Sequence, residues 1–182
     1  MRCQRLSSVW KVLASALFAI ALMAPAPSQA DTIGSEDNIG IGLGTGTFTS
    51  GLTGKFYLDK KSAIQLHVGN FGTWGNYYCG FACGFGLSAD YIYEFQDLVN
   101  ESAGRLFLGA GGGAYFASYD AYGRYGRYAG SFGLHGVFEL GWHFSEFPLE
   151  IVIDIRPVFD FTPGFIDNFF GLTGGASIRF FF

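Results

Sequence analysis

The chain has 182 residues, a formal net charge of −4 and an aromatic content of 19%. This length suits one domain and is too short for two substantial ones. Three of the 11 basic residues lie within residues 1–30, whereas all 15 acidic residues follow that segment. The rest of the chain is therefore strongly acidic. Because sequence-independent nucleic-acid binding depends on basic residues that neutralise phosphates, we expect no nucleic-acid partner.

Residues 1–30 have the order of an export signal. Basic residues come first, an uncharged apolar run follows at residues 12–24, and the small residues Ser28 and Ala30 suit signal peptidase. The apolar run has about 13 residues, fewer than the roughly 20 that a membrane-spanning helix needs. We therefore predict a cleaved signal peptide over residues 1–30 and a mature domain over residues 31–182.

The mature domain is rich in glycine and has no apolar run long enough to cross a bilayer as a helix. If it enters a membrane, it must do so as a closed barrel of strands, because every backbone polar group has to be paired within the hydrocarbon. Alternation of apolar and polar residues with period two, bounded by turn residues, predicts eight strands. They are residues 39–47, 52–59, 62–70, 81–95, 105–116, 131–143, 150–160 and 170–182.

Formal charges within these segments lie on one face only. In residues 150–160, for example, Ile153 and Ile155 alternate with Asp154 and Arg156. The charged residues that share the less apolar face are Lys55, Asp59, Asp90, Glu94, Arg105, Glu139, Glu150, Asp154, Arg156, Asp160 and Arg179. An Arg or Lys on the lipid face near the midplane would cost about 2–4 kcal/mol, so this segregation favours a barrel in lipid. A soluble β-sandwich, with its apolar face buried, is the competing interpretation. We predict an all-β, antiparallel, up-and-down transmembrane β-barrel.

The connections alternate in length. Short turns are predicted at residues 59–61 and 145–148 and a longer turn at 96–103, and longer loops are predicted around residues 72–80, 117–130 and 161–169. With both termini in the periplasm, the turns would be periplasmic and the loops extracellular. One interfacial aromatic girdle is predicted from Tyr91, Tyr93, Phe95, Trp142, Phe144, Phe180 and Phe182, and part of the other from Phe81, Phe116, Phe132 and Phe159.

The closing segment carries a specific pattern. Phe182 is the terminal residue, and Phe180, Ile178 and Ala176 precede it at every second position. Together with the signal peptide and the eight alternating segments, this chain resembles small outer-membrane β-barrels of the OmpA/OmpX type, over the whole mature domain. The resemblance implies the outer membrane of a Gram-negative bacterium, with its lipid and lipopolysaccharide as partners. It also implies that Ala176, Ile178, Phe180 and Phe182 are the signal read by the barrel-assembly machinery.

A polar network is expected inside the barrel. Its predicted members are Lys55, Asp90, Glu94, Arg105, Glu139, Asp154, Arg156 and Arg179. The interior of an eight-stranded barrel is just wide enough to be filled by side chains. We therefore favour a structural plug of ion pairs, with a narrow conducting path as the functional alternative.

One predicted loop combines tyrosine at every third position with two arginines. Its candidate recognition residues are Tyr119, Tyr122, Arg124, Tyr125, Arg127 and Tyr128. Tyrosine and arginine are favoured at recognition sites, and arginine pairs well with phosphate. The loop could contact lipopolysaccharide or an extracellular partner that the sequence does not identify; an irregular loop with local stacking is the alternative.

Cys79 and Cys83 lie at the mouth of the predicted fourth strand. In a fully extended strand they would be about 13 Å apart, too far for a bond. A disulfide therefore requires the segment to curl, which Gly80 permits. We favour a disulfide over two free thiols, because disulfides persist outside the cytoplasm.

Two motifs with catalytic or cofactor-binding associations were weighed. Gly109 to Ala114 fits the spacing G-x-G-x-x-A, but no helix follows to hold a pyrophosphate, so no cofactor is expected. His143 and Ser145 resemble the His-x-Ser element of outer-membrane lipid A deacylases, and Glu150 could complete a triad. His143, however, faces inward at the periplasmic end. We assign no catalytic, cofactor-binding or metal residue and predict a structural or interaction protein, with a lipid-modifying enzyme or a narrow channel as alternatives.

Overall fold

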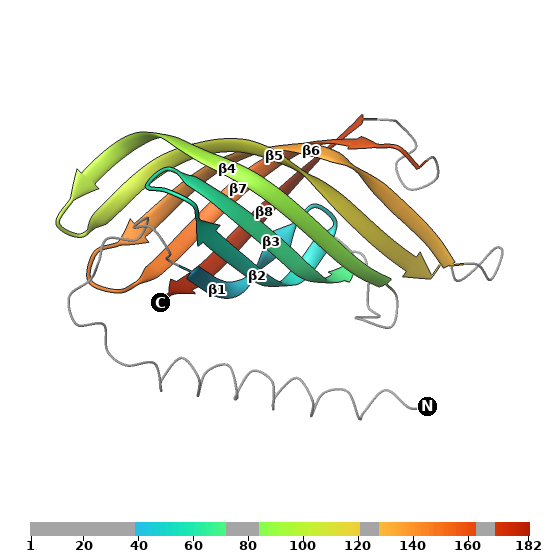
Figure 1. The fold of residues 1–182 in the computed structure, drawn as a ribbon, viewed down its shortest axis with the longest axis horizontal. Helices are drawn as coiled ribbons and strands as arrows, with labels where there is room; N and C mark the ends of the chain where they lie inside the picture. The colour runs from blue at the N-terminus through green and yellow to red at the C-terminus, as the bar shows by residue number, and fades with distance from the viewer. Residues whose placement is uncertain (1–38, 72–83, 121–127, 163–169) are drawn as a thin grey trace, which may run out of the picture. The chain divides into compact units, whose positions relative to one another are not determined.

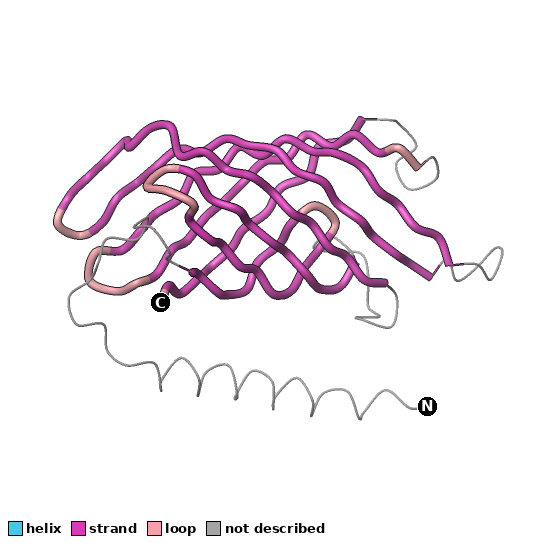
Figure 2. Tube along the Cα trace, viewed as in Figure 1, coloured by secondary structure: helices cyan, strands magenta, loops and turns pink. Residues whose placement is uncertain are grey.

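The computed structural model describes residues 39–71, 84–120, 128–162 and 170–182. These residues form eight strands that close into one antiparallel barrel in sequence order (Figures 1 and 2). The strands are β1 (Ile39–Gly46), β2 (Thr49–Tyr57), β3 (Ser62–Phe71), β4 (Gly84–Glu101), β5 (Gly104–Asp120), β6 (Tyr128–Phe144), β7 (Leu149–Asp160) and β8 (Phe170–Phe181). Within the described ranges, no helix is long and apolar enough to cross a membrane. The predicted all-β closed barrel is confirmed.

Alternation along each strand sorts the side chains between two surfaces of the wall. In β7, Ile151, Ile153 and Ile155 are exposed on the outside, whereas Asp154 and Arg156 are buried in the lumen. The same parity holds in β1 to β3, where the outer face carries Ile, Leu and Phe. Successive side chains of a strand point to opposite faces, so a closed sheet with this pattern has an apolar exterior and a polar core.

The two ends of the barrel differ in their connections. One end, called here the turn end, carries the connections at residues 58–61, 102–103 and 145–148. The opposite end, called here the loop end, carries the tight β1–β2 connection at Thr47 and Phe48. Phe48 adopts a positive φ of 53° and turns its ring into the lumen, where it packs edge-on against Tyr115 at 5.3 Å between ring centroids. Burial of this ring helps to hold an aromatic residue in a backbone conformation that such residues rarely adopt.

The predicted turn at residues 96–103 is wrong, because those residues are mostly strand. β4 continues to Glu101 and pairs with β5 as far as Gly104, so the β4–β5 hairpin extends past the β2–β3 turn (Figure 1). Register shifts fall between Glu94 and Gln96 and again between Asp97 and Val99. Bulges insert unpaired residues and therefore interrupt the period of two. This is why the regular alternation in the sequence breaks off after Phe95.

Two other predicted boundaries also need correction. Asp59 is predicted on the inner face of a strand but is exposed in the β2–β3 turn. Its carboxylate accepts hydrogen bonds from the backbone N–H groups of Lys61 and Ser62 at 2.7 and 2.8 Å. This local capping by Asp ends the strand at Tyr57. The predicted loop at residues 117–130 is shorter, because β5 and β6 remain paired up to Asp120 and Tyr128.

Glycines on the inner face make room for charged groups as well as for rings. A Cβ atom on Gly109 would lie 2.8 Å from Cγ of Glu139, and one on Gly113 would lie 2.5 Å from Oδ1 of Asp90. On β1, a Cβ atom on Gly40 would lie 2.6 Å from the ring of Phe181. Small residues in a narrow barrel therefore give the interior its capacity for large side chains.

The barrel closes between β1 and β8 over a short seam. Their register runs from the Gly40–Phe181 pair to the Gly44–Ser177 pair. Beyond it, the hydroxyl of Thr45 accepts a hydrogen bond from the amide of Ala176 at 2.8 Å and lies 3.4 Å from its carbonyl oxygen. β8 itself continues toward the loop end through residues 170–175, where its neighbour is β7.

Candidate functional site

The buried interior of the barrel holds the largest concentration of interacting charged groups in the described part of the chain. They form two sets, one nearer the turn end and one nearer the loop end. The first set, called here the turn-end network, comprises Lys55, Tyr57, Gln65, Glu94, Arg105, Glu139, His143, Glu150 and Arg179. The second, the loop-end network, comprises His67, Asp90, His135, Asp154 and Arg156.

Lys55 is the centre of the turn-end network. Its Nζ atom lies 2.9 Å from both Glu94 and Glu150 and 3.3 Å from Glu139, and all four side chains are essentially inaccessible to solvent. The ammonium group also lies 4.9 Å from the ring centroid of Phe107. One cation thus contacts three carboxylates that come from β4, β6 and β7, and it draws distant strands together.

Arg179 and Arg105 neutralise the remaining acidic charge of this network. Arg179 donates to Glu150 at 2.5 Å and to the side-chain carbonyl oxygen of Gln65. The side-chain NH₂ group of Gln65 donates in turn to Glu139 at 2.7 Å. Arg105 donates to Glu94 at 2.5 Å and to Asp97, nearer the rim, at 3.0 Å. Three cations therefore face three carboxylates within the lumen, and few oxygen atoms are left without a partner.

Asp90 and Arg156 organise the loop-end network. Arg156 donates to Asp90 at 2.8 Å and to Asp154 at 2.7 Å. Asp90 also lies 2.5 Å from Nε2 of His135 and 3.5 Å from Nε2 of His67. Nearer the loop end, the hydroxyl of Ser131 donates to Asp160 at 2.7 Å.

The physical consequence of both networks is that the lumen is filled. Burying a charge without a partner is very costly, and the cost falls only where good geometry and further hydrogen bonds satisfy the remaining atoms. Here carboxylates and cations from different strands satisfy one another, so the arrangement ties the barrel wall together across its interior. An ion that passed through would have to separate pairs that are in direct contact.

All eight residues predicted for the lumen network are in it, although Arg105 retains a side-chain exposure of 20%. The structure joins them to residues that were left out of that prediction: Tyr57, Gln65, His67, His135, His143 and Glu150. Their inward parity in the strands was the available signal. The alternation places Glu150 on the inner face, but from the sequence it is considered as a possible triad partner of His143 and Ser145.

The His143 motif contributes to the turn-end network. Nε2 of His143 lies 2.6 Å from Glu150, and Nδ1 lies 3.0 Å from Arg105. Ser145 is exposed in the β6–β7 turn, where its amide donates to the carbonyl oxygen of Ala103 at 3.2 Å. His143 thus contacts lumen residues, and Ser145 is held by its backbone in the turn.

One group of residues has the composition of a metal site. Glu94, His143 and Glu150 each offer one ligand atom, and these atoms lie within 4.8 Å of one another. No spacing along the chain marks this group, since its members are on three different strands. The ammonium group of Lys55 already contacts both carboxylates, so a divalent cation would have to displace it.

Several predicted site residues fall outside the described part of the chain. They are Tyr122, Arg124, Tyr125, Arg127, Cys79 and Cys83. Tyr119 and Tyr128 are placed by their backbones, in β5 and β6 respectively. The predicted loop recognition site and the predicted disulfide therefore stay predictions. For the predicted assembly signal, Ala176 and Ile178 lie on the exposed outer face of β8.

Comparison of the chain with protein-family models, with curated proteins and with solved structures found no match. The functional argument therefore depends on the geometry of this barrel.

Proposed function

We propose that this chain is an outer-membrane β-barrel protein with a structural or interaction role, in which a rigid, plugged barrel displays extracellular loops. The observation that carries the proposal is the inverted polarity of the wall. The outer face is lined by exposed Ile, Leu and Phe, while buried charges fill the lumen. A water-soluble barrel would expose its charges and bury its apolar residues.

The lengths of most strands are sufficient to cross a bilayer. A transmembrane β-strand needs about 9–11 residues at a tilt of about 45°. β3 has 10 residues and β7 and β8 have 12, whereas β1 and β2 have 8 and 9. β4, with 18 residues, and β5 and β6, with 17 each, are longer than a bilayer span requires. With the turn end in the periplasm, the loop end would face the exterior, as in the outer-membrane barrels that the sequence resembles.

The proposed partners follow from this placement. Outer-membrane lipid and lipopolysaccharide would contact the apolar wall, and the barrel-assembly machinery would read Ala176, Ile178, Phe180 and Phe182 during biogenesis. Any extracellular partner would be bound by the loops. We propose no catalytic role, because His143 contacts Tyr57, Arg105 and Glu150 of the turn-end network in the lumen.

Refolding and conductance test the proposal together. The mature chain, residues 31–182, refolded from urea into detergent should migrate differently on a gel before and after boiling. In planar bilayers, the folded protein should give no steady openings, because the networks occupy the lumen. Large steady openings from pure protein would contradict the plug and favour a channel. A failure to insert into lipid vesicles would contradict the membrane placement.

A separate assay addresses the enzymatic alternative. Folded wild-type protein and a Ser145→Ala variant are incubated with lipid A, and the released acyl chains are measured. We expect no release from either protein. Release that depends on Ser145 would replace the structural role with lipid hydrolysis.

A further inference from the structure

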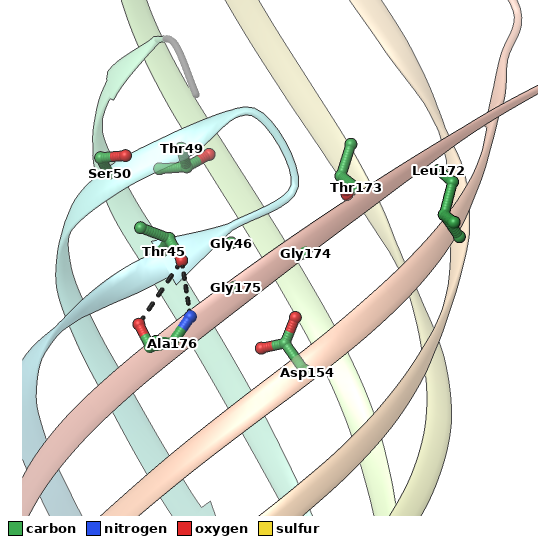
Figure 3. A pocket seen from close by; sticks show the side chains of 10 residues that line it. All are labelled: Thr45, Gly46, Thr49, Ser50, Asp154, Leu172, Thr173, Gly174, Gly175 and Ala176. Atoms are coloured by element: carbon green, nitrogen blue, oxygen red, sulfur yellow. Dashed lines mark hydrogen bonds between the residues drawn. The ribbon is translucent and has the colours of Figure 1, made fainter. Parts of the chain in front are cut away.

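The wall of the barrel has a notch beside the β1–β8 seam. Residues 170–175 of β8 extend past the end of β1, and a cavity of about 580 Å³ opens between them and the β1–β2 hairpin. Its lining, called here the lateral notch, includes Thr45, Ser50, Thr173, Gly174 and Asp154 (Figure 3). Most of these positions offer oxygen atoms in a wall whose outer surface is otherwise apolar.

Backbone groups of β8 add to the polar character of the notch. The amide and carbonyl groups of Ala176 are directed toward β1, where Thr45 contacts both. In an antiparallel strand, alternate residues direct these groups to the same side. Those of Gly174 and Leu172 are therefore directed toward the notch, beyond the last β1–β8 pair. Such groups are costly to leave unpaired in hydrocarbon.

An apolar groove continues from the notch along the outer wall. Its cavity of about 460 Å³ is lined mainly by Leu43, Ile151 and Ile178, and it shares Thr45 and Ala176 with the notch. β1 runs from the turn end toward the loop end, so Leu43 and Ile178 place the groove nearer the turn end than the notch.

The polar notch and the adjoining apolar groove together match an amphiphile with a polar head and an acyl chain. A polar head at the notch and an acyl chain in the groove would match the orientation of a lipid in the outer leaflet, with the head toward the exterior and the chain toward the bilayer centre. The notch presents hydroxyls and backbone carbonyls, which favour a head with hydrogen-bond donors over an anionic head. The carboxylate of Asp154 borders the notch from the lumen side, where both of its oxygens accept hydrogen bonds from Arg156.

We propose that the lateral notch and its groove bind one acyl-chain amphiphile whose head carries ammonium or hydroxyl donors, taken from the outer leaflet. The inference rests on the proposed membrane placement, since the ligand enters from the bilayer side. The bound head would supply partners to the backbone of Gly174 and Leu172 and would complete the seam between β1 and β8. Asp154 would stay paired with Arg156 on the lumen side of the head.

Two leucine substitutions at outward-facing glycines provide a matched test. Gly174 lines the notch, and a Cβ atom there would lie 3.3 Å from the carbonyl oxygen of Asp154. Gly112 is on the outer face of β5, outside the notch lining, where a Cβ atom would lie 3.2 Å from the carbonyl oxygen of His135. Gly174→Leu should fill the notch, whereas Gly112→Leu should leave it open with a similar local strain.

Binding is measured by native mass spectrometry of the folded protein, in a volatile buffer with a detergent that is removed in the gas phase. Lysophosphatidylethanolamine is the probe. Wild type and Gly112→Leu should each retain one lysolipid. Gly174→Leu should lose it by a factor of roughly ten or more, as expected when the head loses one or two hydrogen bonds worth about 1 kcal/mol each. Ala176→Leu, which fills the junction of notch and groove, is the second variant if Gly174→Leu does not fold.

The outcomes separate this inference from the membrane placement. Equal retention by the wild type and both notch variants, or several lysolipids bound without preference, would mean annular lipid only and would overturn the site. Lysophosphatidic acid of the same chain length, which lacks the ammonium, should bind more weakly; equal binding would overturn the assignment of the head. Loss of the boiling-dependent gel shift in the wild type would instead reject the barrel itself.

Discussion

At the scale of single residues, Lys55 is the side chain on which the lumen depends most. It is the shared partner of Glu94, Glu139 and Glu150, all of which are inaccessible to solvent. Removing one partner of a buried ionic group is far more damaging than replacing the whole group, because the remaining charges stay buried without compensation.

Replacing Lys55 by methionine should therefore lower the free energy of unfolding by about 3–5 kcal/mol. Urea titration of the refolded barrel in vesicles, followed by tryptophan fluorescence, measures this change. Lys60→Met is the matched control, because Lys60 is exposed in the β2–β3 turn, and it should unfold like the wild type. Equal stability of the two variants would mean that the three carboxylates are not held by Lys55.

Asp59 gives a prediction of pH dependence at the turn end. The pKa of its carboxyl is lowered from 3.8, chiefly by the hydrogen bond from the amide of Lys61 and then by those from Ser62. A group with a lowered folded-state pKa contributes stability above its unfolded pKa and loses that contribution as the pH falls through the folded value. Wild type should therefore be more stable than Asp59→Ala at neutral pH.

The difference between wild type and Asp59→Ala should shrink below about pH 4, the ordinary range of an aspartate pKa. Urea unfolding of both proteins from pH 7 down to pH 2 measures it. A difference that stays constant across this range would show that the carboxylate charge has no part in holding the turn.

The members of the lumen networks could be predicted from the sequence, but their pairing could not. Alternation identifies which side chains point inward, because it depends only on neighbours along one strand. The contacts of Lys55 with Glu139 and Glu150 join residues that are 84 and 95 positions apart. They depend on the register and tilt of several strands around the barrel, which local patterns do not contain.

At the scale of strands, inward-facing glycines make room in the lumen for large side chains on neighbouring strands. Gly40 on β1 lies against the ring of Phe181 on β8, within the short seam that closes the barrel. The bulged β4 strand shows the opposite case. There, extra residues near Gln96 and Asp97 interrupt the alternation, so the sequence pattern indicated a turn where the strand continues.

Gly40→Ala should destabilise the barrel, because the added methyl group would lie 2.6 Å from the Phe181 ring. Overpacking of this kind typically costs about 1–3 kcal/mol. Gly54→Ala on β2 is the control, since its methyl group would meet no atom closer than 3.7 Å. Replacing a strand glycine without a clash should be neutral or stabilising. If the two variants unfold at the same urea concentration, the ring of Phe181 is not confined by Gly40.

At the scale of the whole molecule, the account depends on a barrel whose apolar side faces outward. The closed topology leaves each strand paired with two neighbours along most of the wall, and the seam beside β8 is the place where that pairing ends early. The fold class followed from alternation and charge segregation in the sequence. The early end of the seam could not be foreseen, because it results from the relative lengths and stagger of β1 and β8.

The most direct measurement is the quenching of tryptophan fluorescence by lipids brominated near the bilayer centre. Two single-tryptophan versions of residues 31–182 are made with Trp74 and Trp142 replaced by phenylalanine. One carries Ile153→Trp on the exposed outer face and the other Phe107→Trp in the buried lumen. In vesicles, Ile153→Trp should be strongly quenched and Phe107→Trp should not. Equal quenching of the two proteins by brominated lipid, relative to unbrominated lipid, would contradict the barrel in lipid. Stronger quenching of Phe107→Trp than of Ile153→Trp would contradict it as well.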